Sequence, residues 1–265
     1  MVSKRVEIER CETPSRTHII LIPSFNTGPR LLETVALARS YWCPVVVIVD
    51  GSTDGSGVSL SRVTEHDAGL RVLTLERNRG KGAAVLEGLR LAHAGGFTHA
   101  LTMDADGQHP AGLISSFMSL SLEHPEAMIL GRPVFDNTAP RARVYGRRIS
   151  NGLANVKTLW AGIGDALCGF RVYPIAPLKR IMEGTRWMRG FDFDAEAAVR
   201  LSWAGVSPIS RPVPVTYFRP EEGGVSHFHY VRDNAVLTWM HVRLLAEFGS
   251  RLPLALARGF RSSPR

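Results

Sequence analysis

The first half of the chain alternates short apolar runs with segments in which apolar residues recur every three or four positions. The short runs predict buried β-strands, and the three-to-four spacing predicts helices between them. We predict strands at residues 18–22, 45–49, 71–75, 98–103 and 127–130, and helices at residues 29–41, 55–64, 83–94 and 111–122. Strands that are apolar on both faces and alternate with helices indicate an α/β fold, with a mostly parallel sheet and helices on both faces.

The second half of the chain is less regular. It predicts helices at residues 145–160, 193–204 and 229–248, strands at 169–173 and 213–218, and loops at 136–143 and 219–224. No Ser/Gly-rich linker or repeat divides the chain. We therefore expect a polar arm at residues 1–17, one domain at residues 18–230, and an amphipathic helix with a basic tail at residues 231–265.

Polar side chains follow four of the predicted strands near the point where each strand ends. They are residues 23–26, Asp50, Lys81 and the pair Asp104 and Asp106. Ligands of open α/β sheets bind beyond the carboxyl ends of the strands. The spacing of these clusters therefore predicts one binding site at that edge.

The acidic stretch contains the clearest candidate for metal chemistry. In extended backbone, residues two apart point the same way, so Asp104, Asp106 and Gln108 can face one object. Oxygen ligands without cysteine or clustered histidine favour a hard ion such as Mg²⁺ or Mn²⁺. An acidic turn that only caps the next helix would have the same local pattern.

The basic stretch at residues 77–82 offers three cations and two glycines ahead of a predicted helix. Backbone amides at a helix start, together with positive side chains, can hold a diphosphate. Gly82 follows Lys81, so the stretch is not a P-loop. A solvated basic turn is the alternative for this stretch. Asp50 can likewise bond a ribose or base, or serve only as a turn residue.

Composition narrows the partners and the compartment. The net charge of +8 and the pI near 9.9 suit anionic partners such as phosphorylated small molecules, acidic membranes or nucleic acid. We expect no nucleic-acid binding, because the cations are interspersed rather than gathered in a stripe. The three cysteines are far apart and predict reduced thiols in a cytoplasmic protein. We expect neither a signal peptide nor a membrane span.

The ordered series of motifs resembles glycosyltransferase family 2, and within it the dolichyl- and polyprenyl-phosphate sugar transferases. The motifs are residues 23–26, 49–54, 78–82 and 103–110, continuing through 131–132, 148–151 and 165–171. The resemblance implies a GT-A fold and an inverting enzyme. It would move a hexose from a GDP- or UDP-linked nucleotide-sugar donor to a lipid acceptor, most closely a polyprenyl phosphate.

The resemblance also implies roles for individual residues. Pro23, Phe25 and Asp50 would hold the nucleoside, and Lys81 would approach the nucleotide. Mg²⁺ or Mn²⁺ on the donor diphosphate would be held by Asp104, Asp106 and Gln108, while Arg219 would contact the donor phosphates.

The acceptor side depends on whether the attacking group is a phosphate or a hydroxyl. A phosphate is already anionic and needs positioning cations, for which Arg132 and Arg148 are the candidates. A hydroxyl of a glycan or glycolipid needs a general base. We place Asp165 on the acceptor side, ahead of Asp194 and Glu196, whose positions also suit a helix start. Surface basicity is the alternative for the two arginines.

Three tryptophans and the C-terminal segment complete the expectations. We expect Trp187, Trp203 and Trp239 to lie in the core. The segment at residues 251–265 mixes large apolar residues with arginines and contains no acid. Such a mixture suits peripheral contact with an anionic membrane, here on its cytoplasmic face. A helix packed on the domain with a solvated basic end is the alternative.

Overall fold

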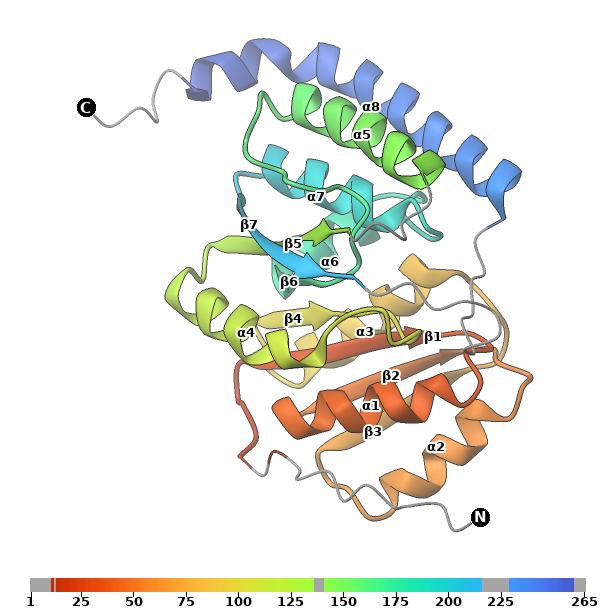
Figure 1. Cartoon of the computed structure of the whole chain (residues 1–265). Coiled ribbons are helices and arrows are strands. Elements are labelled where there is room, and N and C mark those ends of the chain that lie inside the picture. The colour runs from red at the N-terminus through yellow and green to blue at the C-terminus, as the bar shows by residue number, and fades with distance from the viewer. Residues whose placement is uncertain (1–10, 12, 136–140, 216–228, 260–265) are drawn as a thin grey trace.

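The computed structural model describes residues 11, 13–135, 141–215 and 229–259. Seven strands form one sheet in the order β3-β2-β1-β4-β6-β5-β7, with helices on both faces (Figure 1). The strands are β1 (His18–Ser24), β2 (Val45–Asp50), β3 (Leu70–Leu75), β4 (His99–Thr102), β5 (Ala127–Val134), β6 (Arg171–Pro174) and β7 (Ser207–Pro214). Only β6 among them runs antiparallel to its neighbours.

The central strands are buried on both faces, as their continuous apolar sequence requires. Every residue of β1 and β2 is buried. Alternate residues belong to opposite cores: Ile19 and Leu21 pack into one, and Ile20 and Ile22 into the other. The predicted mostly parallel sheet is therefore confirmed.

Two sets of helices cover the two faces. The helices are α1 (Arg30–Tyr41), α2 (Ser56–Thr64), α3 (Lys81–Ala94), α4 (Ile114–Glu123), α5 (Arg141–Lys157), α6 (Ile175–Glu183), α7 (Phe193–Trp203) and α8 (Tyr230–Gly259), with a short 3₁₀ turn at Ala111–Leu113. Helices α1, α2 and α4 supply one core, and α3, α6 and α7 supply the other. Helices α5 and α8 lie side by side over α7 and extend the second layer outward (Figure 1).

Several boundaries in the second half were predicted wrongly. Strand β7 occupies Ser207–Pro214 rather than residues 213–218, and residues 216–218 lie outside the described part. Helix α5 begins at Arg141, inside the predicted loop at 136–143. Helix α6 was missed because two prolines flank its start, although proline is tolerated in a first helical turn. Trp239 is 55% exposed and is not a core residue.

Strand β6 brings a late part of the chain to the same edge as an early one. Its antiparallel register pairs Arg171 with Thr102, so β6 begins where β4 ends. The turn that precedes Arg171 therefore lies beside the acidic stretch that follows Thr102. None of the described helices has the length and apolar character needed to cross a membrane.

Buried histidines give the fold a dependence on pH. His18 stacks on His99 with ring centroids 4.6 Å apart, and its Nε2 lies 3.0 Å from Ser121 Oγ. Burial, with a smaller effect from His99, lowers the pKa of His18 from 6.5 to about 4. The unfolded chain therefore binds a proton between these pH values that the folded chain excludes.

We predict that stability falls as the pH drops from 6.5 to 4, because His18 contributes about 3 kcal/mol above this window and nothing below it. Urea unfolding at a series of pH values measures the loss. A His18→Gln variant should show a shallower slope. His109 and His241, whose pKa values are also lowered to about 4, act in the same direction as His18, and Asp106, whose pKa is raised to about 6, opposes them. An unchanged slope in the variant would contradict the prediction.

Candidate active site

A cavity of about 1250 Å³ opens at the carboxyl edge of β1, β2 and β4 and continues between α5 and α8. It brings together the residues that the sequence analysis placed on the donor side. They are Pro23, Phe25, Asp50, Lys81, Asp104, Asp106 and Gln108. Arg219 lies outside the described residues. The four polar clusters of the first half thus share one site, as their positions after the strands predicted.

Asp50 holds the basic loop against the end of β2. Its two carboxylate oxygens accept hydrogen bonds from the backbone N–H groups of Arg79 (2.9 Å) and Gly80 (2.8 Å). Burial raises the pKa of Asp50 in spite of these two bonds. Gly51 has φ +67°, and a Cβ on it would lie 2.3 Å from the backbone nitrogen of Asn78. Asp50 and Gly51 therefore fix the loop that leads to Lys81.

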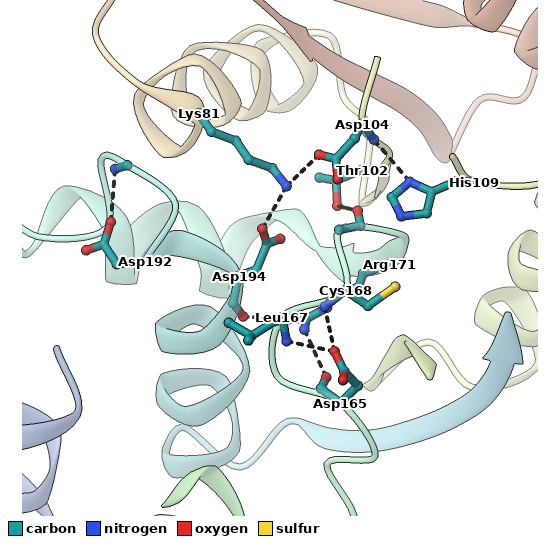
Figure 2. A network of polar contacts seen from close by, with 12 residues as sticks. Lys81, Thr102, Asp104, His109, Asp165, Leu167, Cys168, Arg171, Asp192 and Asp194 are labelled. Atoms are coloured by element: carbon teal, nitrogen blue, oxygen red, sulfur yellow. Dashed lines mark hydrogen bonds and ion pairs between the residues drawn. The ribbon is translucent and has the colours of Figure 1, made fainter. Parts of the chain in front are cut away.

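Lys81 is the first residue of α3 and joins two carboxylates from distant parts of the chain (Figure 2). Its Nζ lies 2.5 Å from Asp104 Oδ1 and 2.7 Å from Asp194 Oδ2. Burial alone would raise the pKa of both carboxyl groups. For Asp104 burial is opposed by Lys81, His109 and Arg147, which together lower the pKa, whereas for Asp194 burial prevails and the pKa is raised. The Oδ1 atom of Asp194 is buried without a hydrogen-bond partner among the described residues.

Asp106 lies beside Asp104 and loses its proton less readily than Asp104 does. Burial, and then the charge of Asp104, raise the pKa of Asp106 to about 6. The backbone N–H of Gln108 donates to Asp106 Oδ1 over 3.0 Å, and His109 accepts the backbone N–H of Asp104 at its Nδ1 over 3.4 Å. Two crowded carboxylates with a neighbouring amide oxygen form a donor set that suits a divalent cation.

This donor set is too small to surround an ion by itself. Within the described part of the chain, no three His, Cys, Asp or Glu side chains gather in a metal-holding group. A Mg²⁺ or Mn²⁺ ion commonly completes its coordination with water and with the phosphates of a substrate. Asp104, Asp106 and Gln108 therefore fit an ion that binds together with a phosphorylated ligand.

Two glycines permit the close approach of segments that build the site. A Cβ on Gly169 would lie 2.5 Å from Asp104 Oδ2 and 2.8 Å from Lys81 Nζ. The Thr102 hydroxyl donates to the carbonyl of Gly169 over 3.1 Å, which fixes this segment beside β4 (Figure 2). A Cβ on Gly82 would lie 2.2 Å from the carbonyl oxygen of Met188. Side chains at either position would push these segments away from Lys81.

Asp165 is buried, and hydrogen bonds occupy both of its carboxylate oxygens. Its Oδ1 accepts hydrogen bonds from Arg147 (2.7 Å) and from the backbone N–H groups of Leu167 (2.8 Å) and Cys168 (2.7 Å). Its Oδ2 accepts one from Asn151 (3.1 Å). The residue does not line the cavity, whereas Asp194 does. The geometry therefore favours Asp194 over Asp165 as the carboxylate available to a substrate.

The cavity changes character between α5 and α8. Its walls there include the apolar residues Ile149, Leu153, Val236, Leu237 and Val242, which form an apolar groove, interspersed with polar residues such as Ser150, Asn234 and His241. Arg147 lines the wall on α5 where the polar and apolar parts meet, with its guanidinium on Asp165. The site thus combines a charged end with an apolar groove.

A comparison of sequences identifies the family to which this arrangement belongs. Residues 19–182, more than half of the chain, match the model of "Glycosyl transferase family 2". The chain is a family 2 glycosyltransferase. Its sheet and the position of its site at the carboxyl edge agree with the resemblance seen in the motifs.

Relatives of this glycosyltransferase include enzymes named for lipid phosphates. Polyprenol monophosphomannose synthase of Mycolicibacterium smegmatis is 26% identical over 253 residues, which cover 93% of this chain and 92% of the relative. Undecaprenyl-phosphate mannosyltransferase of Micrococcus luteus is 24% identical over 219 residues, which cover 77% and 85%.

A solved structure supports the fold. Residues 1–349 of S. aureus TarS in complex with UDP-GlcNAc match with a TM-score of 0.56 at 18% identity, covering 93% of this chain and 73% of that one. The glycosyltransferase has the GT-A fold, as the motifs implied.

The two arginines that the sequence analysis placed on the acceptor side lie away from the cavity of this glycosyltransferase. Arg132 is exposed on β5, and Arg148 is exposed on α5 with its guanidinium 5.8 Å from the ring centroid of Tyr145. Neither lines the cavity. Adjacent helical residues point about 100° apart, so Arg147 faces the site when Arg148 faces outward. The sequence shows the Arg147-Arg148 pair but not the rotation of the helix that selects between them.

Proposed function

We propose that the protein is an inverting transferase that moves a hexose from a GDP- or UDP-linked sugar to a polyprenyl phosphate. The observation that carries this proposal is the two-part cavity, with Lys81 and the acidic cluster at one end and an apolar groove at the other. The lipid phosphates in the names of the two relatives support the same acceptor class.

The charged end suits the donor. Pro23, Phe25 and Asp50 would surround the nucleoside, and Asp104, Asp106 and Gln108 would hold Mg²⁺ or Mn²⁺ on the diphosphate. When bound, such an ion supplies Lewis-acid stabilisation of the charge that develops on the leaving phosphate.

Lys81 is placed to stabilise the leaving nucleotide. An ammonium group has three N–H donors. Asp104 and Asp194 occupy two of them, so one remains for a phosphate oxygen in the cavity. The two carboxylates hold the ammonium group in place before the sugar–phosphate bond breaks, which lowers the cost of reorganisation during the reaction.

The other end suits an anionic lipid acceptor. A phosphate nucleophile needs no general base, and a guanidinium group at the mouth of the groove would position it. Because Arg132 and Arg148 lie away from the cavity, we assign this role to Arg147. The apolar groove would take the first isoprenoid units of the acceptor.

A hydroxyl acceptor is the second candidate function. The unpartnered Oδ1 of Asp194 lies in a buried carboxyl group whose pKa is raised, which are properties of a general base. On this alternative the same donor chemistry would serve a glycan or glycolipid, and Asp194 would accept the hydroxyl proton.

The exposed surface of α5 and α8 around the groove suits peripheral contact with an anionic membrane. Large apolar side chains are exposed on these two helices, namely Tyr145, Ile149, Tyr230, Trp239 and Val242, and three of them, Ile149, Tyr230 and Val242, also line the cavity. Arg148 and Arg232 are exposed on the same two helices. Aromatic residues and arginines of this kind favour the membrane interface. This surface would bring the groove to a lipid acceptor, while most of the basic tail lies outside the described side chains.

The test is a transfer assay with UDP- and GDP-hexoses and three matched acceptors: a polyprenyl phosphate, the corresponding polyprenol, and a glycolipid. We expect transfer to the polyprenyl phosphate alone, with inverted configuration at the anomeric carbon by NMR. Equal transfer to the polyprenol or the glycolipid would select the hydroxyl alternative. No transfer from any nucleotide sugar would contradict both.

The metal set is tested in the same assay. Asp106→Asn should leave the fold intact and reduce turnover by about 10²–10³-fold, the range for loss of one transition-state electrostatic contact. The control is Glu87→Gln, because Glu87 pairs with Arg79 and Arg90 away from the cavity. Full activity in the presence of a strong chelator would exclude the assigned ion.

A further inference from the structure

Three buried side chains form a hydrogen-bonded chain behind the groove. The Nζ of Lys157, at the end of α5, lies 2.6 Å from Nδ1 of His241 on α8. The Nε2 of His241 lies 2.8 Å from the hydroxyl oxygen of Ser150 on α5. Ser150 and His241 line the cavity, and Lys157 is fully buried behind them.

The direction of these hydrogen bonds follows from the charge states. Burial lowers the pKa of Lys157 to about 8 and that of His241 to about 4. At pH 7 the lysine is therefore charged and the imidazole neutral. An ammonium group can only donate, so Nδ1 of His241 accepts and the ring proton resides on Nε2. The Nε2–H group then donates to Ser150, and the Ser150 oxygen is an acceptor.

The hydroxyl proton of Ser150 is left for the cavity. Serine and threonine in helices often donate to a carbonyl one turn earlier. Thr158 donates in this way to the carbonyl of Ala154, and Ser202 to that of Ala198. Within the described part of the chain, the side-chain hydroxyl of Ser150 makes one hydrogen bond, the one with His241. Its proton can therefore point to a ligand in the groove.

Lys157 has no carboxylate partner in the described part of the chain. Glu196 of α7 acts on its charge from a distance and Arg243 of α8 opposes it. Glu196 itself is occupied by Arg243 and Arg200. Burying a cation without a paired acid is costly. A residue that only linked α5 to α8 would not need to bury a positive charge. A charged Lys157 is needed if its role is to fix the tautomer of His241 and so orient the Ser150 hydroxyl toward the cavity.

We propose that Lys157 and His241 are positioning residues that hold Ser150 as a hydrogen-bond donor to the anionic group of the acceptor. Arg147 lies three residues earlier on α5, so both donors stand on the same helical face. This proposal rests on the proposed function, because it assigns a contact to the same acceptor.

A measurement without substrate tests the orientation first. In protein labelled with ¹⁵N-histidine, the two ring nitrogens of His241 report its tautomer directly. We expect Nε2–H at pH 7, and loss of this preference in Lys157→Met. A ring protonated on Nδ1 in the unmodified protein would overturn the proposal, whether or not transfer to a lipid phosphate is observed.

Kinetics then test the link to the acceptor. Lys157→Met and His241→Phe should each raise KM for a short polyprenyl phosphate by about tenfold or more, the loss of one hydrogen bond to a charged group, and leave KM for the nucleotide sugar unchanged. His241→Gln should restore acceptor KM, because its amide can accept from Lys157 and donate to Ser150. Glu247→Gln, which loosens the α7–α8 contact with Arg200, is the control and should change neither constant.

The pH profile separates positioning from structural support. Acceptor KM of the unmodified enzyme should rise above pH 8, where Lys157 loses its charge and the tautomer is no longer fixed. The profile of His241→Gln should be flatter, because an amide has no tautomer to lose. Equal changes in both KM values, or a folded Gln variant without rescue, would overturn the proposal. If no variant transfers to a lipid phosphate, the proposed function fails and the tautomer measurement still decides the orientation.

Discussion

Lys81→Met should abolish detectable transfer and destabilise the fold by about 3–5 kcal/mol, the usual cost of removing one partner from a buried charge cluster. Lys81 is the cation between Asp104 and Asp194. Without it the two carboxylates face each other in a buried site, and one must take up a proton on folding. The activity loss follows from the missing charge opposite the leaving phosphate, at about 10²–10³-fold or more.

The sign of the pH effect provides a sharper check of the same variant. In Lys81→Met the carboxyl groups have folded-state pKa values above those of the unfolded chain. These carboxyl groups make the folded variant bind protons more strongly than the unfolded chain, so the stability difference between the unmodified protein and the variant should shrink as the pH falls toward 4, on top of the loss that the buried histidines cause in both. Unfolding by urea between pH 7 and pH 4 measures this. The double variant Lys81→Met/Asp194→Asn should recover stability without recovering activity. Recovery of both would show that Lys81 has only a structural role.

The two candidate acceptor carboxylates should respond to substitution in opposite ways. Asp194→Asn should retain transfer to a polyprenyl phosphate within about tenfold, because loss of a general base usually costs 10²–10⁴-fold and an anionic nucleophile needs none. Asp165→Asn should lose stability, because the amide oxygen can keep the three bonds at the Oδ1 position but carries no negative charge opposite Arg147, and the NH₂ group cannot accept the bond that Asn151 donates to Oδ2. We expect a loss of about 3–5 kcal/mol for this buried pair.

Turnover and thermal unfolding of the two variants, measured side by side, decide between the acceptor classes. Asn151→Asp is a useful companion to Asp165→Asn, since it restores one carboxylate to the same cluster. A fold as stable as the unmodified protein in Asp165→Asn would contradict the structural role. A loss of 10³-fold or more in Asp194→Asn, with Lys81 and the fold intact, would instead assign Asp194 as a base.

The part of the cavity around Lys81 and the acidic cluster could be predicted from the sequence because strand and motif coincide there. Continuous apolar strands fix both the sheet and the edge at which Asp50 and Asp104 emerge. Because neighbouring strands are parallel, their carboxyl ends lie at the same edge of the sheet. The side chains that follow them therefore come close together there, whatever conformation the loops adopt. The motif series also indicates the family, and the family implies the fold.

The acceptor half could not be predicted with the same accuracy because it depends on helix rotation and on burial. Arg147 and Arg148 are chemically identical, and only the packing of α5 against α8 decides which faces the cavity. Asp165 belongs to one of the motifs, but its carboxylate accepts hydrogen bonds from the backbone N–H groups of Leu167 and Cys168. No sequence pattern reveals these hydrogen bonds. Trp239 has helical spacing with core residues and nevertheless lies on the outer face of α8.

The reversed strand β6 has a consequence for how this enzyme could acquire new acceptors. In a sheet of parallel strands, only segments that leave a strand reach the ligand edge. Because β6 runs the other way, a segment that enters a strand reaches that edge as well, directly beside the stretch that leaves β4. Leu167, in the segment that enters β6, lines the cavity, so this segment can change its contribution to the cavity while the acidic cluster stays anchored to β4. Under the proposed function, donor chemistry can be inherited unchanged while the acceptor side diversifies.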